Sequence, residues 1–175
     1  YTFQLVEGAS RIGDNWRVRY DELSLFTTRE ISKLPGLDIP GNPQGYPPRD
    51  QFADYLEHYA SFMELPVKVN CKITKVTKNK KGGFTSIDSE GNEFKSRSIV
   101  LANGPYQTAT VLGMAKNLSK DVIQITSEDY KNSSQLDSFS RVLVVGDGAY
   151  GRDMAAEFSE NNTTFLAKGS FRFLM

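Results

Sequence analysis

The chain has 175 residues, in which 21 lysines and arginines balance 21 aspartates and glutamates. Its length suits one core of ordinary size, and 39% hydrophobic residues are typical of a globular protein rather than a disordered one. The balanced charge gives no signature of a nucleic-acid partner, and no apolar run reaches the roughly 18 residues of a membrane span. Cys71 and His58 are each alone in their type, which excludes a disulfide framework, a CxxC redox pair and a zinc site. We therefore expect a cytoplasmic protein whose chemistry comes from a bound group.

Up to Pro66 the sequence predicts one strand, one long loop and one helix. Residues 1–6 alternate between apolar and polar side chains as a strand does, and residues 13–16 predict a turn. Residues 38–48 hold most of the prolines and predict a long irregular loop. Residues 49–65 predict a helix, because apolar residues recur at helical spacing and Pro66 ends the pattern. The apolar stripe comprises Phe52, Tyr55, Leu56, Tyr59, Phe62 and Met63.

A three-stranded antiparallel meander follows this helix. Residues 67–78 alternate, residues 84–88 form a second strand, and a third begins near Phe94, with a glycine-containing turn at each connection. The meander leads into a predicted buried strand at residues 99–102. Cys71 falls on the apolar face of the first strand and is expected in the core.

The C-terminal third predicts a βαβ unit. Residues 141–145 form an apolar strand of the kind found in parallel sheets, residues 149–161 a helix, and residues 163–167 a second strand. Residues 106–140 are loosely patterned, with one short strand predicted at residues 122–125. The alternation of strands and helices makes α/β the expected fold class.

A glycine-rich loop joins the first strand of this unit to its helix. The loop is Gly146, Asp147, Gly148, Ala149, Tyr150 and Gly151, a G-x-G-x-x-G motif. In such a motif the first glycine permits a tight turn, the second lets the backbone approach a pyrophosphate, and the third lets the helix pack closely. A purely structural glycine turn is the alternative. The strand–turn–helix context favours dinucleotide binding.

The residues after the second strand indicate which dinucleotide binds. An acidic residue there would bind a ribose 2′-hydroxyl, whereas basic residues accommodate a 2′-phosphate. Lys168, Ser170 and Arg172 occupy this region, with no carboxylate among residues 167–172. We therefore expect NADPH rather than NADH, the alternative being that Lys168 and Arg172 are simply solvated.

A second nucleotide site is predicted at the N-terminal end. Glu7 ends the first strand, where the second strand of a Rossmann unit places its ribose-binding carboxylate. On the residues alone, an ordinary charge at a strand end is the alternative. Both chain ends are apolar, so we expect them to interrupt a longer chain, unless a strand docks at each terminus.

Six segments in chain order carry a resemblance to a known family. They are residues 7–17, 20–25, 34–36, 45–50, 99–104 and 141–148. Together they resemble the flavin-containing monooxygenase-like flavoproteins, and most nearly their bacterial branch associated with potassium transport. The resemblance covers essentially the whole chain.

The resemblance implies two nested Rossmann-like dinucleotide-binding domains, both incomplete in this chain. Residues 1–104 would form a partial FAD-binding domain that lacks its first strand and glycine loop. Residues 105–175 would form the N-terminal part of an inserted NADPH-binding domain, with Gly146, Gly148 and Gly151 on the pyrophosphate. In the FAD-binding part, the implied site residues are Glu7 on the adenosine ribose, Arg11 nearby, Trp16 beside the flavin, Ile73 on the adenine through its backbone, and Asn103 and Gly104 at the crossing between domains.

The implied activity is that of an FAD- and NADPH-dependent monooxygenase. NADPH reduces the flavin, and reduced flavin activates oxygen to oxygenate a small molecule at nitrogen, sulfur or a carbonyl. Thr126 stands four residues before Tyr130 where the family commonly has histidine, Thr28 stands where monooxygenases have asparagine, and Asn103 replaces a threonine. These departures keep open an NADPH-dependent flavin reductase or oxidase of the same fold as an alternative. The expected lack of the FAD glycine loop keeps open a second alternative, an inactive fragment that is only a fold module. The sequence also leaves a homo-oligomer open.

Overall fold

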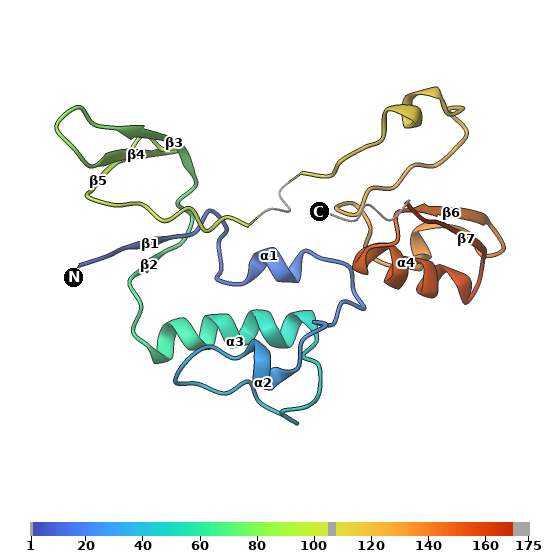
Figure 1. Ribbon diagram of the computed structural model, residues 1–175, viewed down its shortest axis with the longest axis horizontal. Helices are drawn as coiled ribbons and strands as arrows, with labels where there is room; N and C mark the ends of the chain where they lie inside the picture. Colours follow the sequence, from blue (N-terminus) through green and yellow to red (C-terminus); the bar gives the residue numbers. More distant parts are fainter. Residues whose placement is uncertain (1, 105–107, 170–175) are drawn as a thin grey trace, which may run out of the picture. The chain divides into compact units, whose positions relative to one another are not determined.

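The computed structural model describes residues 2–104 and 108–169 of the chain (Figure 1). It contains two compact units, one formed by Tyr1–Val18 and Ser24–Gln107 and the other by Arg19–Leu23 and Thr108–Met175. The short segment Arg19–Leu23 therefore groups with residues that begin 85 positions after it, at Thr108. The predicted division at residue 104 into two nucleotide-binding domains stays a prediction.

The first unit is organised around a parallel strand pair and one long helix. Strand β1 (Leu5–Val6) pairs with β2 (Val67–Lys68), and α3 (Arg49–Phe62) precedes β2 in the chain. Short helix α1 (Asp14–Arg17) packs on α3, as Figure 1 shows, and α2 (Arg29–Ser32) lies within the loop region before α3. Residues 13–16 are thus partly helical, where a turn was predicted.

Helix α3 buries a narrower face than its apolar stripe predicts. Its buried residues are Ala53, Tyr55 and Ala60, whereas Phe62 is 55% exposed. The helix ends at Phe62 instead of residue 65, because Glu64 adopts a left-handed backbone with φ 50°. The hydroxyl of Tyr55 accepts a hydrogen bond from Leu34 N (2.6 Å) and donates one to Leu37 O (2.9 Å). Tyr55 thereby fixes the loop that precedes α3 in sequence.

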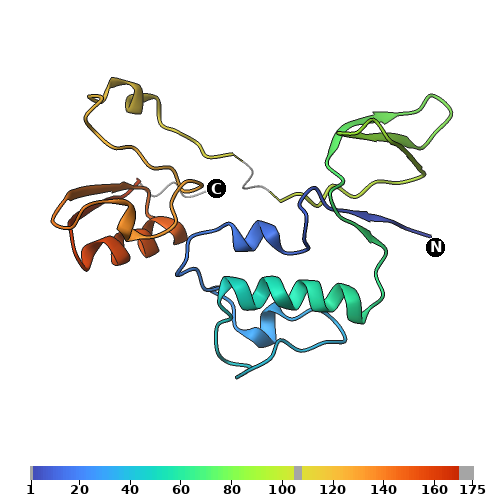
Figure 2. The same cartoon turned by 180° about the vertical axis from the view of Figure 1, so that it is seen from behind.

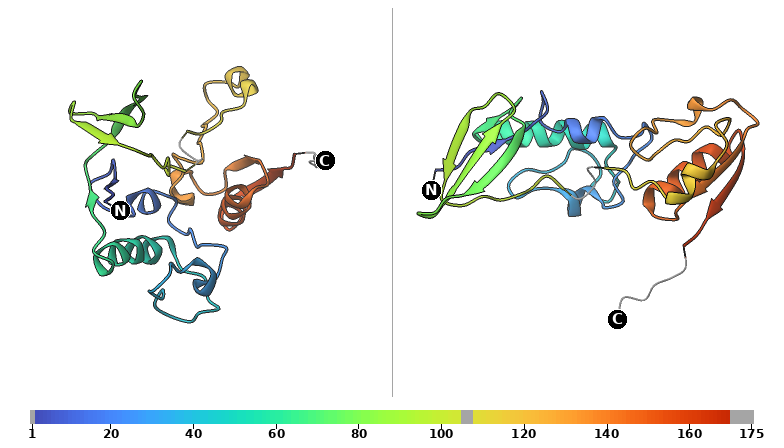
Figure 3. Two further views of the ribbon diagram at one scale, coloured as in Figure 1. Left: turned by 60° about the vertical axis from the view of Figure 1, so that its left-hand side comes forward. Right: turned by 90° about the horizontal axis from the view of Figure 1, so that it is seen from above.

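The predicted antiparallel meander is confirmed. It consists of β3 (Ile73–Lys78), β4 (Phe84–Asp88) and β5 (Glu93–Ser96) in the order β3-β4-β5, and its three strands are seen clearly in the right-hand view of Figure 3. The prediction of one continuous strand over 67–78 is wrong, since the left-handed Asn70 (φ 53°) separates β2 from β3. Cys71 is buried, as expected.

The strand predicted at residues 99–102 is absent from the structure. These residues are irregular, and Val100 is 87% exposed. An apolar run becomes a strand only where a neighbouring strand supplies hydrogen-bond partners, and none of the described strands pairs with this run. The short strand predicted at 122–125 is also wrong, and Ile123 lies exposed in an irregular segment.

The second unit contains the predicted βαβ arrangement. Strands β6 (Arg141–Val145) and β7 (Thr163–Ala167) pair in parallel, and α4 (Ala149–Ser159) connects them and packs on both (Figure 2). Two 3₁₀ helices, η1 (Gly113–Asn117) and η2 (Ser133–Gln135), precede the unit. The core is formed by Tyr20, Leu23, Tyr130, Val142, Met154 and Phe158.

Only one face of the β6–β7 pair is covered by α4. Leu143 and Phe165 are register partners, and both are at least half exposed, as is Val145. The Arg141 guanidinium lies 5.9 Å from the centre of the Phe165 ring on this surface. Among the helices of the described residues, none is long and apolar enough to cross a membrane.

We predict that Tyr55→Phe lowers the free energy of unfolding by about 1–2 kcal/mol, because Leu34 N and Leu37 O lose their shared partner. Urea unfolding measures the change. Tyr59→Phe is the matched control, since it removes one hydroxyl bond to Pro35 O at a more exposed position, and it should cost clearly less. Equal losses for both variants would contradict the prediction.

Candidate functional site

The glycine loop lies between β6 and α4 and has the geometry of a close-packed strand-to-helix turn. Gly146 has φ 112°, a conformation that disfavours any side chain. A Cβ atom on Gly151 would lie 1.9 Å from the carbonyl oxygen of Gly146, so only glycine lets the helix approach the strand end this closely. A Cβ on Gly148 would meet nothing within 4 Å, so the space in front of this residue is open. The three glycines thus have three distinct structural roles.

The N-terminus of α4 provides hydrogen-bond donors for an anion. Gly148 is the N-cap residue, and no side chain caps the helix. The first-turn N–H groups of a helix have no partners within the helix, and the helix dipole adds positive potential there. An open approach at Gly148, next to an uncapped helix of eleven residues, fits a phosphate or pyrophosphate group.

Lys168 lies at the same sheet edge as the loop. Val145 and Ala167 are paired at the carboxyl ends of β6 and β7, and Gly146 N donates to Ala167 O at 3.0 Å. Lys168 follows directly and is exposed. Ser170 and Arg172, predicted with Lys168 to select NADPH, lie outside the described residues.

Asp147 and Tyr150, the larger side chains of the loop, have partners within the second unit. Arg152 Nε donates to the carbonyl oxygen of Asp147 at 2.9 Å, and Arg152 Nη2 lies 3.9 Å from the Asp147 carboxylate. The Tyr150 ring meets Tyr20 edge-to-face, with 5.5 Å between the ring centres. Ala149 begins α4 beside them.

Glu7 and Ile73, two predicted flavin-site residues, are connected through the backbone after β1. Glu7 N donates to Lys68 O (2.9 Å), and Glu7 O accepts from Cys71 N (2.8 Å), two residues before β3 begins at Ile73. The Glu7 carboxylate accepts from Ala9 N at 2.9 Å. It therefore closes the turn that follows β1, and binding of the FAD ribose by Glu7 stays a prediction.

Arg11 belongs to an ion-pair network on α3. Its Nε and Nη2 donate to the Glu57 carboxylate, at 2.6 Å for the shortest contact, and Nη2 lies 3.4 Å from Asp54. Arg17 reaches Asp54 at 2.7 Å from the same side. Hydrogen bonds from Arg11 lower the pKa of Glu57, and the pKa of Arg11 is raised in return. The network joins the segment after β1 to α3, whereas a place near the adenosine ribose of FAD stays a prediction for Arg11.

Trp16 also faces α3. Its ring meets Phe52 edge-to-face, with centres 5.0 Å apart. Gly13 has φ 86°, and a Cβ there would lie 2.7 Å from Ala53 O, so this glycine lets α1 approach α3. Asn103 and Gly104 lie in the exposed, irregular segment that ends the described part of the first unit.

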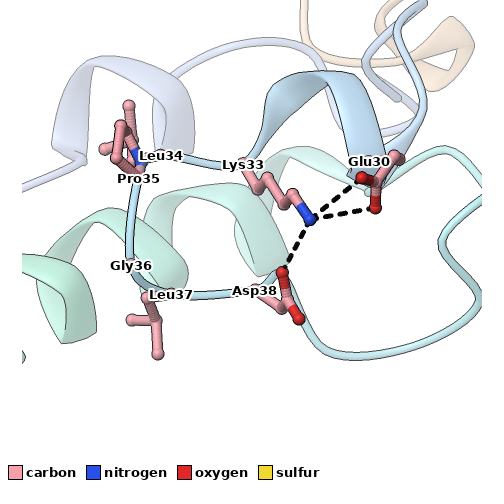
Figure 4. Close-up of a pocket in the computed structure, with 7 residues that line it drawn as sticks. All are labelled: Glu30, Lys33, Leu34, Pro35, Gly36, Leu37 and Asp38. Carbon is pink, nitrogen blue, oxygen red and sulfur yellow. Dashed lines mark hydrogen bonds and ion pairs between the residues drawn. The ribbon is translucent and has the colours of Figure 1, made fainter.

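A shallow cavity of about 460 Å³ lies beside α2 in the first unit (Figure 4). Lys33 Nζ forms ion pairs with Glu30 and Asp38 across it, each at 3.0 Å, and residues 34–37 complete the lining. None of the predicted nucleotide-binding residues lines this cavity. We therefore assign it no part in dinucleotide binding.

Sequence reasoning missed two buried tyrosines that bind carboxylates of α4. Tyr20 OH donates to Asp153 Oδ2 at 2.5 Å, and Tyr130 OH donates to Glu157 Oε2 at 2.7 Å. The only available signal was the spacing of the two acidic residues, which places them on one face of the helix. Nothing in the local sequence identifies the tyrosines as their partners.

Comparisons with known proteins agree with this architecture. Residues 5–170 match the family described as pyridine nucleotide-disulphide oxidoreductase. An uncharacterized CzcO-like oxidoreductase of Geobacillus kaustophilus is 40% identical over 95% of this chain and 47% of its own length. A probable indole-3-pyruvate monooxygenase of Arabidopsis thaliana, YUCCA9, is 28% identical over 98% of this chain and 42% of its own length. The chain thus spans about half the length of the curated relatives it matches.

A solved structure supports the fold independently of sequence. A double mutant of a flavin monooxygenase from Stenotrophomonas maltophilia superimposes with a TM-score of 0.84 over 95% of this chain and 57% of that chain. Their sequence identity is 21%, so this likeness shows the Rossmann-type α/β fold alone. The expected fold class and family resemblance are confirmed. The chain belongs to the pyridine nucleotide-disulphide oxidoreductase family.

Proposed function

We propose that this chain is part of an FAD- and NADPH-dependent oxidoreductase, in which the second unit binds the nicotinamide dinucleotide. Two observations on the glycine loop carry the proposal. The space in front of Gly148 is open, and a Cβ on Gly151 would lie 1.9 Å from the carbonyl oxygen of Gly146. Glycine at both positions is what a dinucleotide loop requires. The family match to pyridine nucleotide oxidoreductases supports the same assignment.

The residues of the glycine loop would bind the pyrophosphate. Backbone N–H groups at the start of α4 donate to its oxygens, and Gly148 leaves room for them. Lys168, beside the loop at the sheet edge, would bind the ribose 2′-phosphate, together with Ser170 and Arg172. Bound NADPH and FAD would supply hydride transfer and oxygen activation, while the protein orients them and excludes water.

The first unit would bind FAD in part. We assign residues 1–104 to an incomplete FAD-binding domain and residues 105–175 to the start of the NADPH-binding domain. Glu7 would bind the adenosine ribose and Ile73 the adenine through its backbone, and the bond to Glu7 O from Cys71 N, two residues before β3, supports this assignment. Arg11, Trp16, Asn103 and Gly104 keep the roles that the family resemblance implies. The single, buried Cys71 supports a cytoplasmic location.

The proposed reaction is oxygenation of a small molecule at nitrogen, sulfur or a carbonyl. A flavin reductase or oxidase without oxygenation is the second candidate, favoured by Thr126. Its hydroxyl donates to Asp129 at 2.7 Å, so it only closes a local turn where the family commonly has a histidine. Thr28, which stands where monooxygenases have asparagine, is the N-cap residue of α2.

We predict that the protein expressed from its complete reading frame is yellow, shows flavin absorbance, and consumes NADPH and oxygen. Oxygen uptake and peroxide release are measured together with a panel of amines, sulfides and ketones. Peroxide equal to the oxygen consumed, with every compound, would select the oxidase. The 175-residue chain alone should keep its fold without steady NADPH consumption. A colourless full-length protein would overturn the proposed function.

We predict that Gly148→Ala raises the Kd for NADPH at least 10-fold, because its methyl group fills the space open to the phosphate. Its φ of −67° and ψ of 178° suit alanine, so the midpoint of thermal unfolding should not fall. Gly113→Ala is the matched control, since a Cβ there also meets nothing within 4 Å. NADPH titration by fluorescence measures both variants. Unchanged binding by Gly148→Ala would place the phosphate elsewhere.

We predict that Lys168→Glu with Arg172→Glu weakens NADPH binding by about 10-fold or more, through loss of charge-assisted bonds to the 2′-phosphate. The Kd for NADH should change little, because NADH lacks that phosphate. Titrations with both nucleotides give the ratio. Equal losses for the two nucleotides would contradict the assignment of this pocket.

A further inference from the structure

The segment Arg19–Leu23 is an integral part of the second unit, although the residues on both sides of it in the chain belong to the first. Asp21 N donates to Lys131 O at 2.7 Å, and Asn132 Nδ2 donates to the Asp21 carboxylate at 2.6 Å. Tyr20 is only 3% exposed. Hydrogen bonds of Asp21 therefore hold the segment against residues 131–132, next to the buried Tyr20.

Tyr20 contacts α4 at two points close to the glycine loop. Its hydroxyl donates to Asp153 Oδ2 at 2.5 Å, and its ring meets Tyr150 edge-to-face, at 5.5 Å and 88°. Tyr150 is the last residue before Gly151 in the glycine motif, and Asp153 lies one turn further along α4. Both contacts act on the part of the helix that would face the phosphate.

Tyr130 makes an equivalent contact at the opposite end of α4. Its hydroxyl donates to Glu157 Oε2 at 2.7 Å, and its ring centre lies 5.2 Å from that of Phe158. Burial, reinforced by the neighbouring carboxylate, raises the pKa of both tyrosines well above the usual value. Both hydroxyls therefore remain donors at neutral pH. The chain thus offers two like hydrogen bonds on one helix, only one of them beside the glycine loop.

We propose that Tyr20 is a positioning residue for the nicotinamide dinucleotide, acting through Asp153 and Tyr150 on the first turn of α4. This inference rests on the proposed function of the glycine loop. Donors that bind a phosphate must be held within about 0.5 Å of their productive positions, and side chains locked by packing and hydrogen bonds provide such support. Tyr20 provides it from a segment that lies more than a hundred residues before the helix in sequence.

The test compares Tyr20→Phe with Tyr130→Phe in the purified protein expressed from its complete reading frame. The measurements are the Kd for NADP⁺, KM and kcat with NADPH, FAD content and the midpoint of thermal unfolding. Tyr20→Phe should raise Kd and KM by about 5- to 20-fold through misplaced donors, with kcat and FAD content unchanged. Tyr130→Phe should lower the unfolding midpoint about as much as Tyr20→Phe does. Its Kd for NADP⁺ should nevertheless stay within about 2-fold of the parent protein's value.

Variants of Asp153 complete the design. Asp153→Ala should raise the Kd as Tyr20→Phe does. The double variant of Tyr20→Phe and Asp153→Ala should bind NADP⁺ no more weakly than either single variant, because the two substitutions remove the same hydrogen bond. Asp153→Asn keeps an acceptor for the hydroxyl and should restore most of the affinity. Equal increases in Kd for Tyr20→Phe and Tyr130→Phe, or no increase for Tyr20→Phe, would overturn the role proposed for Tyr20 and leave the proposed function standing. A parent protein that binds no NADP⁺ would overturn the proposed function with it.

Discussion

The close approach of the Gly151 backbone to the carbonyl of Gly146 is the constraint on which the second unit depends. It brings the first turn of α4 against the end of β6, and α4 then packs along both strands of the pair. The helix N-terminus consequently opens at the carboxyl edge of the sheet, beside Lys168. In open α/β sheets ligands bind at this edge, where backbone donors and helix dipole act together. One backbone contact thus underlies both the packing of the unit and the place of the proposed binding site.

The βαβ unit could be predicted almost completely because its signals are local. An apolar strand, a glycine motif and a helical period agree over 27 consecutive positions, from Arg141 to Ala167. The meander was predictable for the same reason, since its turns are marked by glycine. Helix α3 was predicted too long because a left-handed residue at Glu64 leaves no pattern in side-chain polarity. Residues 99–102 show the opposite error, in which an apolar pattern satisfies the strand rule but no described strand pairs with it.

The parts of the site that sequence reasoning missed depend on contacts between distant residues. Arg11 meets Glu57, 46 positions away, and Tyr20 meets Asp153, 133 positions away. No periodicity or motif contains such a pair, because each partner alone looks like an ordinary surface charge or a scattered aromatic residue. The grouping of Arg19–Leu23 with the second unit has the same origin. Family resemblance supplied roles for Glu7, Arg11 and Trp16, whereas the structure shows the contacts that hold each of them within the first unit.

The exposed apolar strip of β6 and β7 affects how the chain behaves at high concentration. Leu143, Val145 and Phe165 present an exposed apolar surface on the described strands, and the Arg141 guanidinium lies over the Phe165 ring. Such a surface is the kind through which β-proteins associate with copies of themselves. A charged residue in place of Phe165 should therefore reduce association through this face and raise the solubility of the chain.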